Sequence, residues 1–204
     1  MTPRDRMLST IRHALGKPDA QSDPPIGLVR CQAPLHHDLP STFAESLKIL
    51  GGEVIQVAST AEARRKIDQI IGTAPFLASA APIVADCGFS TPFSRESAAA
   101  ARFGITSADY ALADTGSLVF LSESRESRLL SLLPPHHIVV LEKEKILAGL
   151  DDLFARVPLP AEKSSSMVLV TGPSRTGDIE MRLVRGVHGP GEVTVMIVED
   201  VTHR

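Results

Sequence analysis

The sequence predicts an α/β fold in which a mainly parallel central sheet is flanked by helices on both faces. Short apolar runs with the length of buried strands alternate with helical patterns along most of the chain, and such alternation is typical of a parallel sheet. The 204 residues suffice for one domain with a modest appendage. Hydrophobic residues make up 43% and charged residues 22%, the ordinary balance of a globular protein.

The N-terminal segment, 1–39, is expected to lie outside the main domain. Thr2, Pro3 and Asp5 predict the start of a helix, and Gly16 predicts its end. Residues 17–39 are rich in proline and polar residues, which predicts an irregular linker. We therefore expect an N-terminal helical arm and linker at 1–39 and an α/β domain at 40–204. The pair His36–His37 lies in the linker and is expected to be solvated rather than to bind a metal.

Two capping boxes predict helix starts in the first half of the domain, at Thr42 with Glu45 and at Ser59 with Glu62. Glycines at 51–52 and 72 are expected to end these helices. The other elements of this half are expected in this order: a strand at 53–57, one or two short strands within 75–85, a helix at 94–102, an extended piece at 104–106, a helical turn at 108–113 and a strand at 117–121.

The second half continues the alternation. Its expected elements are a helix at 123–133, a strand at 138–141, a helix at 143–157, a strand at 167–170, a glycine-rich turn at 172–177, a helix at 178–187 and a strand at 193–198. The helix at 178–187 is predicted from Ile179, Leu183 and Val187, which recur every fourth residue. Asp178 and Glu180 would occupy its first turn, where the helix dipole favours acids.

Composition excludes several classes of function. The net charge of −3 and a pI near 6.2 argue against a nucleic-acid partner or an acidic membrane surface, because both attract basic faces. Apolar runs fall short of the roughly 20 residues that cross a bilayer, and the N-terminus lacks the apolar core of a secretion signal. Cys31 and Cys87 are far apart and form no metal-binding or disulfide pattern. We expect a cytoplasmic protein that holds no metal.

The turn at 172–177 is the first candidate for a binding site. A strand, a glycine turn with hydroxyl groups and a helix start together form a common anion-receiving arrangement. Backbone amides and Arg175 are expected to hold a single carboxylate or phosphate, and the alternative is a polar turn with a satisfied cap. A nucleotide is excluded, because the G-x-x-x-x-G spacing is followed by Asp178 and Ile179 instead of Lys and Ser or Thr.

Three segments resemble the lactate-utilisation protein C family. They are GITSADYALADTGSLVFL from Gly104, RLLSLLPPHHIVVL from Arg128, and TGPSRTGDIE from Thr171, the last followed by VHGPGE from Val187. The resemblance implies a fold like that of ribose-5-phosphate isomerase and CoA transferases. It also implies a role in oxidising L-lactate to pyruvate beside a partner subunit rich in iron–sulfur clusters. Two cysteines cannot supply the four thiolates of a four-iron cluster, so we expect no cofactor on this chain.

A lactate or pyruvate site needs a cation for the carboxylate and a base for the hydroxyl proton. Arg175 is the best cation, since a guanidinium binds a carboxylate through two parallel hydrogen bonds. His188 is the best base, although a ten-residue helix between them would separate the two by about 15 Å. Asp114 either binds a hydroxyl or caps its own turn. Arg128 is expected to be an exposed helix residue, and the pair His136–His137 is expected to be structural. The remaining candidate ligand-binding residues come from the same two turns: Thr115, Gly116, Ser117, Gly172, Ser174 and Thr176.

Three hypotheses of function follow. The first is a non-cluster subunit of a lactate-oxidising assembly that binds a small carboxylate. The second is an independent enzyme acting on a CoA ester or a sugar phosphate, by analogy of fold alone. The third is a scaffold without a ligand.

Overall fold

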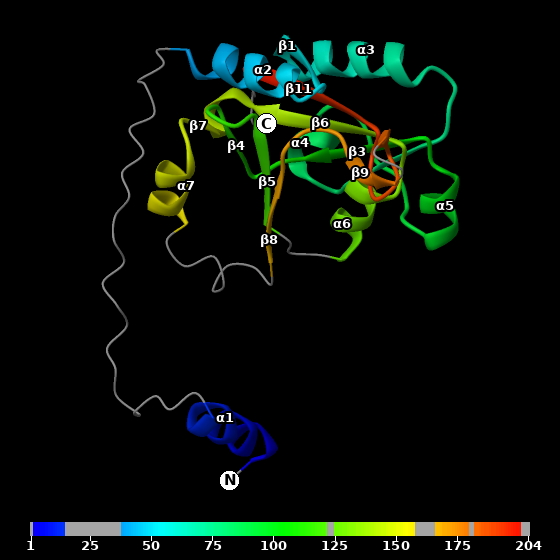
Figure 1. The fold of residues 1–204 in the computed structure, drawn as a ribbon. Coiled ribbons are helices and arrows are strands. Elements are labelled where there is room, and N and C mark those ends of the chain that lie inside the picture. Colours follow the sequence, from blue (N-terminus) through cyan, green and yellow to red (C-terminus); the bar gives the residue numbers. More distant parts are fainter. Residues whose placement is uncertain (1, 15–37, 122–124, 158–165, 180–181, 201–204) are drawn as a thin grey trace. The chain divides into compact units, whose positions relative to one another are not determined.

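A computed structural model describes residues 2–14, 38–121, 125–157, 166–179 and 182–200 (Figure 1). The chain divides into two units, Met1–Gln32 and Ala33–Arg204, which are described separately. Cys31 and the pair His36–His37 lie outside the described residues. No helix of the described part of the chain combines the length and the apolar character needed to cross a membrane.

The first unit contains helix α1 (Pro3–Ala14), which starts where the sequence predicts. The backbone N–H of Asp5 donates to the Thr2 hydroxyl at 3.2 Å, and the Thr2 N–H donates to the Asp5 carboxylate at 2.8 Å. The Thr2 hydroxyl also donates to the Asp5 carboxylate at 2.7 Å, and this bond, together with the one from the Thr2 N–H, stabilises the carboxylate and lowers the pKa of Asp5. The apolar stripe of the helix, Met7, Leu8 and Ile11, is exposed within its unit.

The second unit is built on a parallel sheet of five strands in the order β1-β11-β6-β3-β2. These strands are β1 (Glu53–Ser59), β2 (Phe76–Ala78), β3 (Phe103–Ser107), β6 (His136–Glu142) and β11 (Glu192–Asp200). The last of them along the chain, β11, lies between β1 and β6 (Figure 1). The prediction of a mainly parallel central sheet is confirmed.

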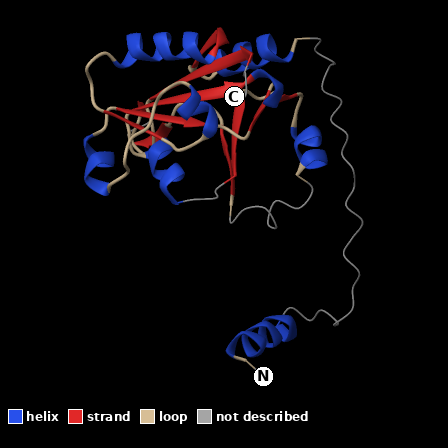
Figure 2. Cartoon of the chain, turned by 180° about the vertical axis from the view of Figure 1, so that it is seen from behind, coloured by secondary structure: helices blue, strands red, loops and turns tan. Residues whose placement is uncertain are grey.

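Helices cover both faces of this sheet, as predicted (Figure 2). Successive side chains of a strand point to opposite faces. Ile138 and Val140 of β6 therefore face one way, against α3 (Thr60–Ile71) and α4 (Pro82–Asp86). Val139 and Leu141 face the other way, against α2 (Leu39–Ile49). Two more helices pack on this second face through Leu77, α5 (Arg95–Ala100) and α6 (Arg125–Leu132).

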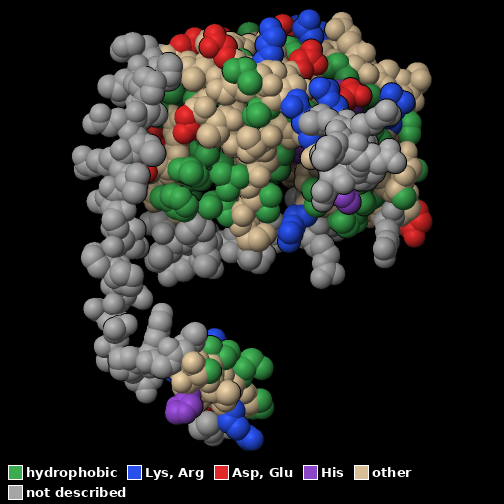
Figure 3. All heavy atoms as spheres, in the orientation of Figure 1, with side chains coloured by type: hydrophobic (Ala, Val, Ile, Leu, Met, Phe, Trp, Pro, Cys, Tyr) green, Lys and Arg blue, Asp and Glu red, His purple; other side chains and the backbone are tan. Residues whose placement is uncertain are grey.

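A second sheet, which the sequence did not predict, shares the face covered by α2. Its order is β7-β4-β5-β8, from β4 (Tyr110–Leu112), β5 (Ser117–Leu121), β7 (Ile146–Leu147) and β8 (Met167–Val170). Its inner side chains, such as Leu118 and Ile146, complete the core around Phe43 of α2. Helix α7 (Leu150–Arg156) covers the outer side through Leu153. Hydrophobic side chains gather over α7 and this sheet in Figure 3, and Leu150 and Phe154 are exposed there.

Two predicted helices are wrong because of this second sheet. The expected helical turn at 108–113 contains β4, whose Ala111 and Leu112 pair with β7. The expected helix at 143–157 is divided into a 3-10 turn, η1 (Lys143–Lys145), then β7 and α7. Gly149 separates β7 from α7 in an extended conformation, which interrupts the helical pattern.

The predicted helix at 178–187 is also wrong. The segment forms a hairpin of β9 (Arg175–Ile179) and β10 (Arg182–Arg185), in which Arg185 pairs with Arg175 and Val184 with Thr176. β-Branched residues such as Thr176 and Val184 favour strands over helices. Apolar residues at every fourth position fit two short paired strands as well as a helix, so the periodicity alone was ambiguous.

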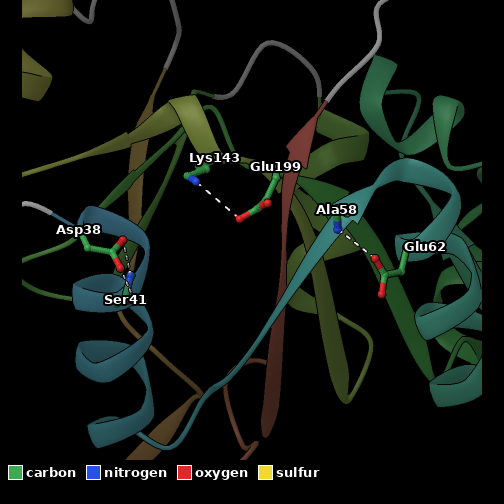
Figure 4. A network of polar contacts seen from close by, with 6 residues as sticks. All are labelled: Asp38, Ser41, Ala58, Glu62, Lys143 and Glu199. Atoms are coloured by element: carbon green, nitrogen blue, oxygen red, sulfur yellow. Dashed lines mark hydrogen bonds and ion pairs between the residues drawn. The ribbon is translucent and has the colours of Figure 1, made fainter.

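One of the two predicted helix starts is confirmed. Ser59 is the N-cap of α3 and accepts the Glu62 N–H at 3.3 Å. The Glu62 carboxylate accepts the N–H of Ala58, the residue before the cap, at 2.9 Å (Figure 4), so the reciprocal bond of a capping box is displaced by one residue. The start at Thr42 is wrong. Helix α2 begins at Leu39, and the carboxylate of Asp38 caps it by accepting the Ser41 N–H at 3.4 Å.

Candidate functional site

A cavity of about 620 Å³ lies at the carboxyl ends of the central strands. Residues 80–82 follow β2, Ser107 ends β3 and is followed by residues 108–109, and Lys145 follows β6. The remaining wall comes from β5, β8 and α6: Phe120, Leu121, Val168, Val170, Arg128, Ser131 and Leu132. Open α/β sheets bind ligands at the carboxyl ends of their strands, and pockets of about 300–1,000 Å³ are typical ligand sites. The cavity has both properties.

The cavity contains a small set of polar groups. Its titratable residues are Arg128, Lys145 and Asp109, two cations against one carboxylate. The Asp109 carboxylate accepts the Leu121 N–H at 2.7 Å, which holds it against the end of β5. The Lys145 ammonium lies 2.8 Å from the Glu142 carboxylate, and its side chain is 35% exposed. With Glu142 beside Lys145 the charges around the cavity balance, and Arg128 and Lys145 are the two lining cations that can contact an anionic ligand.

Two hydroxyl groups add hydrogen-bonding capacity to the cavity. The Ser131 hydroxyl donates its proton to the Arg128 carbonyl oxygen at 2.9 Å, so both of its lone pairs are left to accept, and it donates to a ligand only by exchanging this bond. Ser107 lies at the end of β3, with its hydroxyl 3.4 Å from the Ala108 carbonyl oxygen. Both groups can therefore reorient toward an oxygen atom of a ligand.

A buried histidine supports the cavity wall from the central sheet. The ring of His137 lies 5.8 Å from that of Phe120, centroid to centroid, and its Nε2 lies 2.7 Å from the Thr106 hydroxyl. Burial, with a smaller effect of the neighbouring His136, lowers the pKa of His137 to about 3. The imidazole is therefore neutral at physiological pH. Its Nδ1 has no hydrogen-bond partner among the described residues.

The structure brings together two of the turns that the sequence singled out. Because β5 pairs with β8, the turn at 114–117 lies beside Thr171. The Ser117 hydroxyl lies 2.8 Å from both the Thr115 and Thr171 hydroxyls. Asp114 is exposed at the start of this turn. The three hydroxyl groups of Thr115, Ser117 and Thr171 join the two turns, and they satisfy one another's hydrogen-bonding capacity.

Both turns pack closely on α2 through glycines. Gly116 and Gly172 have φ angles of +66° and +81°, which side chains rarely adopt. A Cβ at Gly116 would lie 2.6 Å from the Leu47 nitrogen, and one at Gly172 would lie 2.9 Å from the Leu50 Cβ. These two glycines therefore serve the contact with the helix.

Arg175 is placed differently from the expectation. Since β9 replaces the predicted helix, the turn at 172–177 has no helix N-terminus to receive an anion. The guanidinium donates instead to the carbonyl oxygen of Leu50, the C-cap of α2. A cation at this position stabilises the negative end of the helix dipole. The contact gives Arg175 a structural role, and its role in anion binding stays a prediction.

His188 lies closer to the turn than expected, because the hairpin folds the chain back. The Ser174 N–H donates to the Pro190 carbonyl oxygen at 2.8 Å, and the Gly186 N–H donates to the Ser174 carbonyl oxygen at 3.0 Å. His188 is exposed within this returning loop. The wide separation expected between Arg175 and His188 assumed a helix that does not form.

The predicted site lies near the amino ends of the central strands. The Gly191 N–H donates to the carbonyl oxygen of Pro135, which directly precedes β6. The cavity is at the opposite, carboxyl edge, and none of the predicted site residues lines it. The carboxyl-end rule, applied to the extended piece at 104–106, could have pointed to Ser107 and Asp109, which follow it. No pattern in the sequence indicated Lys145 as a site residue, because its position depends on the second sheet.

Comparison with known proteins decides the family. The model of the LUD domain matches residues 41–198. The chain belongs to the LUD domain family. The expected resemblance to lactate-utilisation protein C is thereby confirmed.

The LUD domain has three informative relatives among known sequences. Lactate utilization protein C of Halalkalibacterium halodurans is 38% identical over 109 residues, covering 52% of this chain and 47% of that protein. Its counterpart in Geobacillus sp. is 38% identical over 104 residues, covering 49% and 43%. The chain thus matches about half the length of these relatives. An Escherichia coli protein, "Uncharacterized protein YkgG", is 26% identical over 230 residues and covers 98% of this chain and all of that protein.

A solved structure supports the fold of this LUD domain. A DUF162 family protein from Deinococcus radiodurans, determined at 1.70 Å, matches with a TM-score of 0.59 and 21% identity. The match covers 78% of this chain and 96% of that chain. At this identity the likeness shows the fold alone.

The described part of the LUD domain shows no group of three or more His, Cys, Asp or Glu side chains placed to hold a metal ion. Its free cysteine, Cys87, is buried. Burial, with a smaller effect of Asp86, raises the pKa of this thiol to about 11. The thiol is therefore protonated at neutral pH and is a poor nucleophile.

Proposed function

We propose that this LUD domain serves lactate utilisation by binding a small carboxylate in the cavity at the carboxyl edge of the sheet. The names of the relatives support the process. The binding rests on one observation, the presence of Arg128 and Lys145 in the wall of the same largely apolar cavity. This site replaces the turn at 172–177 as the preferred place for the ligand.

The polar groups suit a 2-hydroxy or 2-oxo acid. A guanidinium binds a carboxylate through two parallel hydrogen bonds, so Arg128 receives the carboxylate, and Lys145 adds a second positive charge. Asp109, held by the Leu121 N–H, accepts the hydrogen bond of a 2-hydroxyl group. Ser107 and Ser131 can donate to a 2-oxo group.

In this proposal the chain binds and orients the acid, while oxidation requires an electron acceptor elsewhere. Conversion of lactate to pyruvate removes two electrons and two protons from the substrate. The resemblance to lactate-utilisation protein C implies that iron–sulfur clusters of a partner subunit receive the electrons. Capture of a cluster-bearing protein with the tagged chain, detected by its iron content, tests the assembly.

Titration calorimetry with L-lactate and pyruvate tests the binding. Arg128→Gln and Lys145→Gln should each weaken binding about 10- to 100-fold, since a hydrogen bond to a charged group contributes about 1.5–3 kcal/mol. Arg175→Gln is the matched control, because it removes the same charge at the opposite edge. If Arg175→Gln abolishes binding and Arg128→Gln does not, the ligand belongs to the turn at 172–177.

Other ligands separate the remaining hypotheses. Binding of sugar phosphates or CoA esters, without binding of lactate or pyruvate, would favour the independent enzyme. Absence of binding by every ligand would favour the scaffold. Growth on L-lactate as the carbon source, after deletion of the gene, tests the process itself, and unimpaired growth would contradict a role in lactate utilisation.

A further inference from the structure

The cavity is large for lactate. A water molecule takes about 30 Å³ of the liquid, and lactate has roughly the bulk of five waters, so lactate would fill on the order of a quarter of this space. The cavity volume is about 620 Å³. Pockets usually bury most of the surface of their ligand. The volume beyond the carboxylate and its neighbouring oxygen therefore leaves room for a larger acid.

The wall beside the polar groups is apolar. Phe120 and Leu121 of β5 line it together with Val168 and Val170 of β8, and Leu132 of α6 adds a side chain that is 48% exposed. The remaining apolar lining residues are small: Ala80, Ala81, Pro82 and Ala108. These small side chains take up little of the space, and the larger apolar ones provide contact area for hydrocarbon. Water beside these apolar side chains would have few hydrogen-bonding partners on the protein.

We propose that the cavity takes 2-hydroxy or 2-oxo acids whose side chain is larger and more apolar than the methyl group of lactate. The inference rests on the proposed function, because Arg128 and Lys145 hold the carboxylate in both. The polar groups receive the carboxylate and the neighbouring oxygen. The side chain of the acid extends along Phe120, Val168 and Leu132, where it replaces water.

The test is a calorimetric series of L-2-hydroxy acids of increasing chain length: lactate, 2-hydroxybutanoate, 2-hydroxypentanoate and 2-hydroxyhexanoate. Burial of one CH₂ group contributes about 0.8 kcal/mol, so affinity should rise about fourfold at each step. The corresponding 1-alkanols, which lack the carboxylate, should bind at least about tenfold more weakly than the acids, because they cannot use the two cations.

Variants that fill the cavity test whether the side chain of the acid binds inside it. Val168→Phe should abolish the gain with chain length while lactate still binds. Leu169→Phe is the matched control on the same strand, because neighbouring side chains of a strand point to opposite faces and Leu169 does not line the cavity. If Val168→Phe does not fold, Leu132→Trp fills the same space from the partly exposed face of α6.

The outcomes separate the two proposals. Lactate binding that depends on Arg128, with affinity that stays level or falls along the series, would overturn this inference and leave the proposed function intact. Binding of alkanols as tight as that of the acids would overturn the inference as well. Absence of binding by every acid of the series would remove the proposed function itself.

Discussion

Acidification should destabilise the protein through His137, well above the range in which carboxylates titrate. The pKa of this imidazole is lowered from 6.5 to about 3 by burial beneath Phe120. In the folded state the ring stays neutral down to about pH 3, whereas in the unfolded state it takes up a proton below about pH 6.5. The stability that comes from the neutral ring is therefore present above pH 6.5 and is lost as the pH falls toward 3.

The two pKa values give the size of this loss. Between pH 7 and pH 5 the unfolded state gains about three-quarters of a proton at this position and the folded state almost none, so the free energy of unfolding should fall by about 2 kcal/mol on account of His137. His136, whose pKa is also lowered chiefly by burial, contributes in the same direction. The difference between the wild type and a variant at position 137 isolates the contribution of His137.

Urea unfolding followed by circular dichroism, at pH 7 and pH 5, measures this difference. Because His137→Leu has no imidazole to protonate, it should lose about 2 kcal/mol less than the wild type between the two pH values, whatever its stability at pH 7. His137→Gln is a second variant in case the first does not fold, and His13→Ala on α1 is the control for an exposed histidine. Equal losses in the wild type and in His137→Leu would refute a buried neutral imidazole at this position.

Three further changes have expected outcomes. Gly104→Ala should destabilise by about 1–3 kcal/mol in urea unfolding, because its Cβ would collide with the backbone carbonyl of Leu130, and an unchanged midpoint would contradict that close approach. In a Cys31→Ser background, Cys87 should resist iodoacetamide at pH 8 until the protein unfolds, since its pKa is raised to about 11, and rapid labelling of the native protein would contradict its burial. Asp38→Ala should lower the thermal midpoint, because it removes the N-cap of α2. The Ser41 hydrogen bonds lower the pKa of Asp38, so the difference in thermal midpoint between the wild type and Asp38→Ala should be present above about pH 4 and disappear as the pH falls further.

The central sheet was predictable because its strands carry a local signal. The run at 138–141 is apolar on both faces, as expected for a parallel strand covered by two layers. Helix α3 was predictable from Ser59, Glu62 and Gly72, which act within one turn of its ends. Where the N-cap residue, the apolar periodicity and the terminating glycine agree, the sequence alone predicts the helix.

The second sheet and the hairpin were not predictable in this way. β7 is a two-residue strand that forms by pairing with β4, although β5, α6 and β6 separate them along the chain, and β4 itself also pairs with β5. The apolar residues at 146–154 keep a helical spacing, and the break at Gly149 becomes visible only when β7 has a partner. Tertiary pairing overrides local propensity at such places.

The candidate site was missed for the same reason. Arg128 has the pattern of an exposed helix residue, and only the packing of α6 on the second face of the sheet brings it to the cavity. The turn at 172–177 was selected as a candidate anion site because a helix was predicted to follow it, and that helix does not form. A search restricted to residues after the parallel strands would have found Ser107 and Asp109.

The position of β11 has a consequence for how the protein is made. A chain synthesised only as far as residue 191 has β1 and β6 ready, but the strand that joins them is still missing. Both would present unpaired backbone groups along an apolar edge, a surface that invites association with other nascent chains. We therefore expect folding to be slow and the central sheet to form only after residues 192–200 have been translated. A chain truncated before this strand should form aggregates rather than a smaller stable domain.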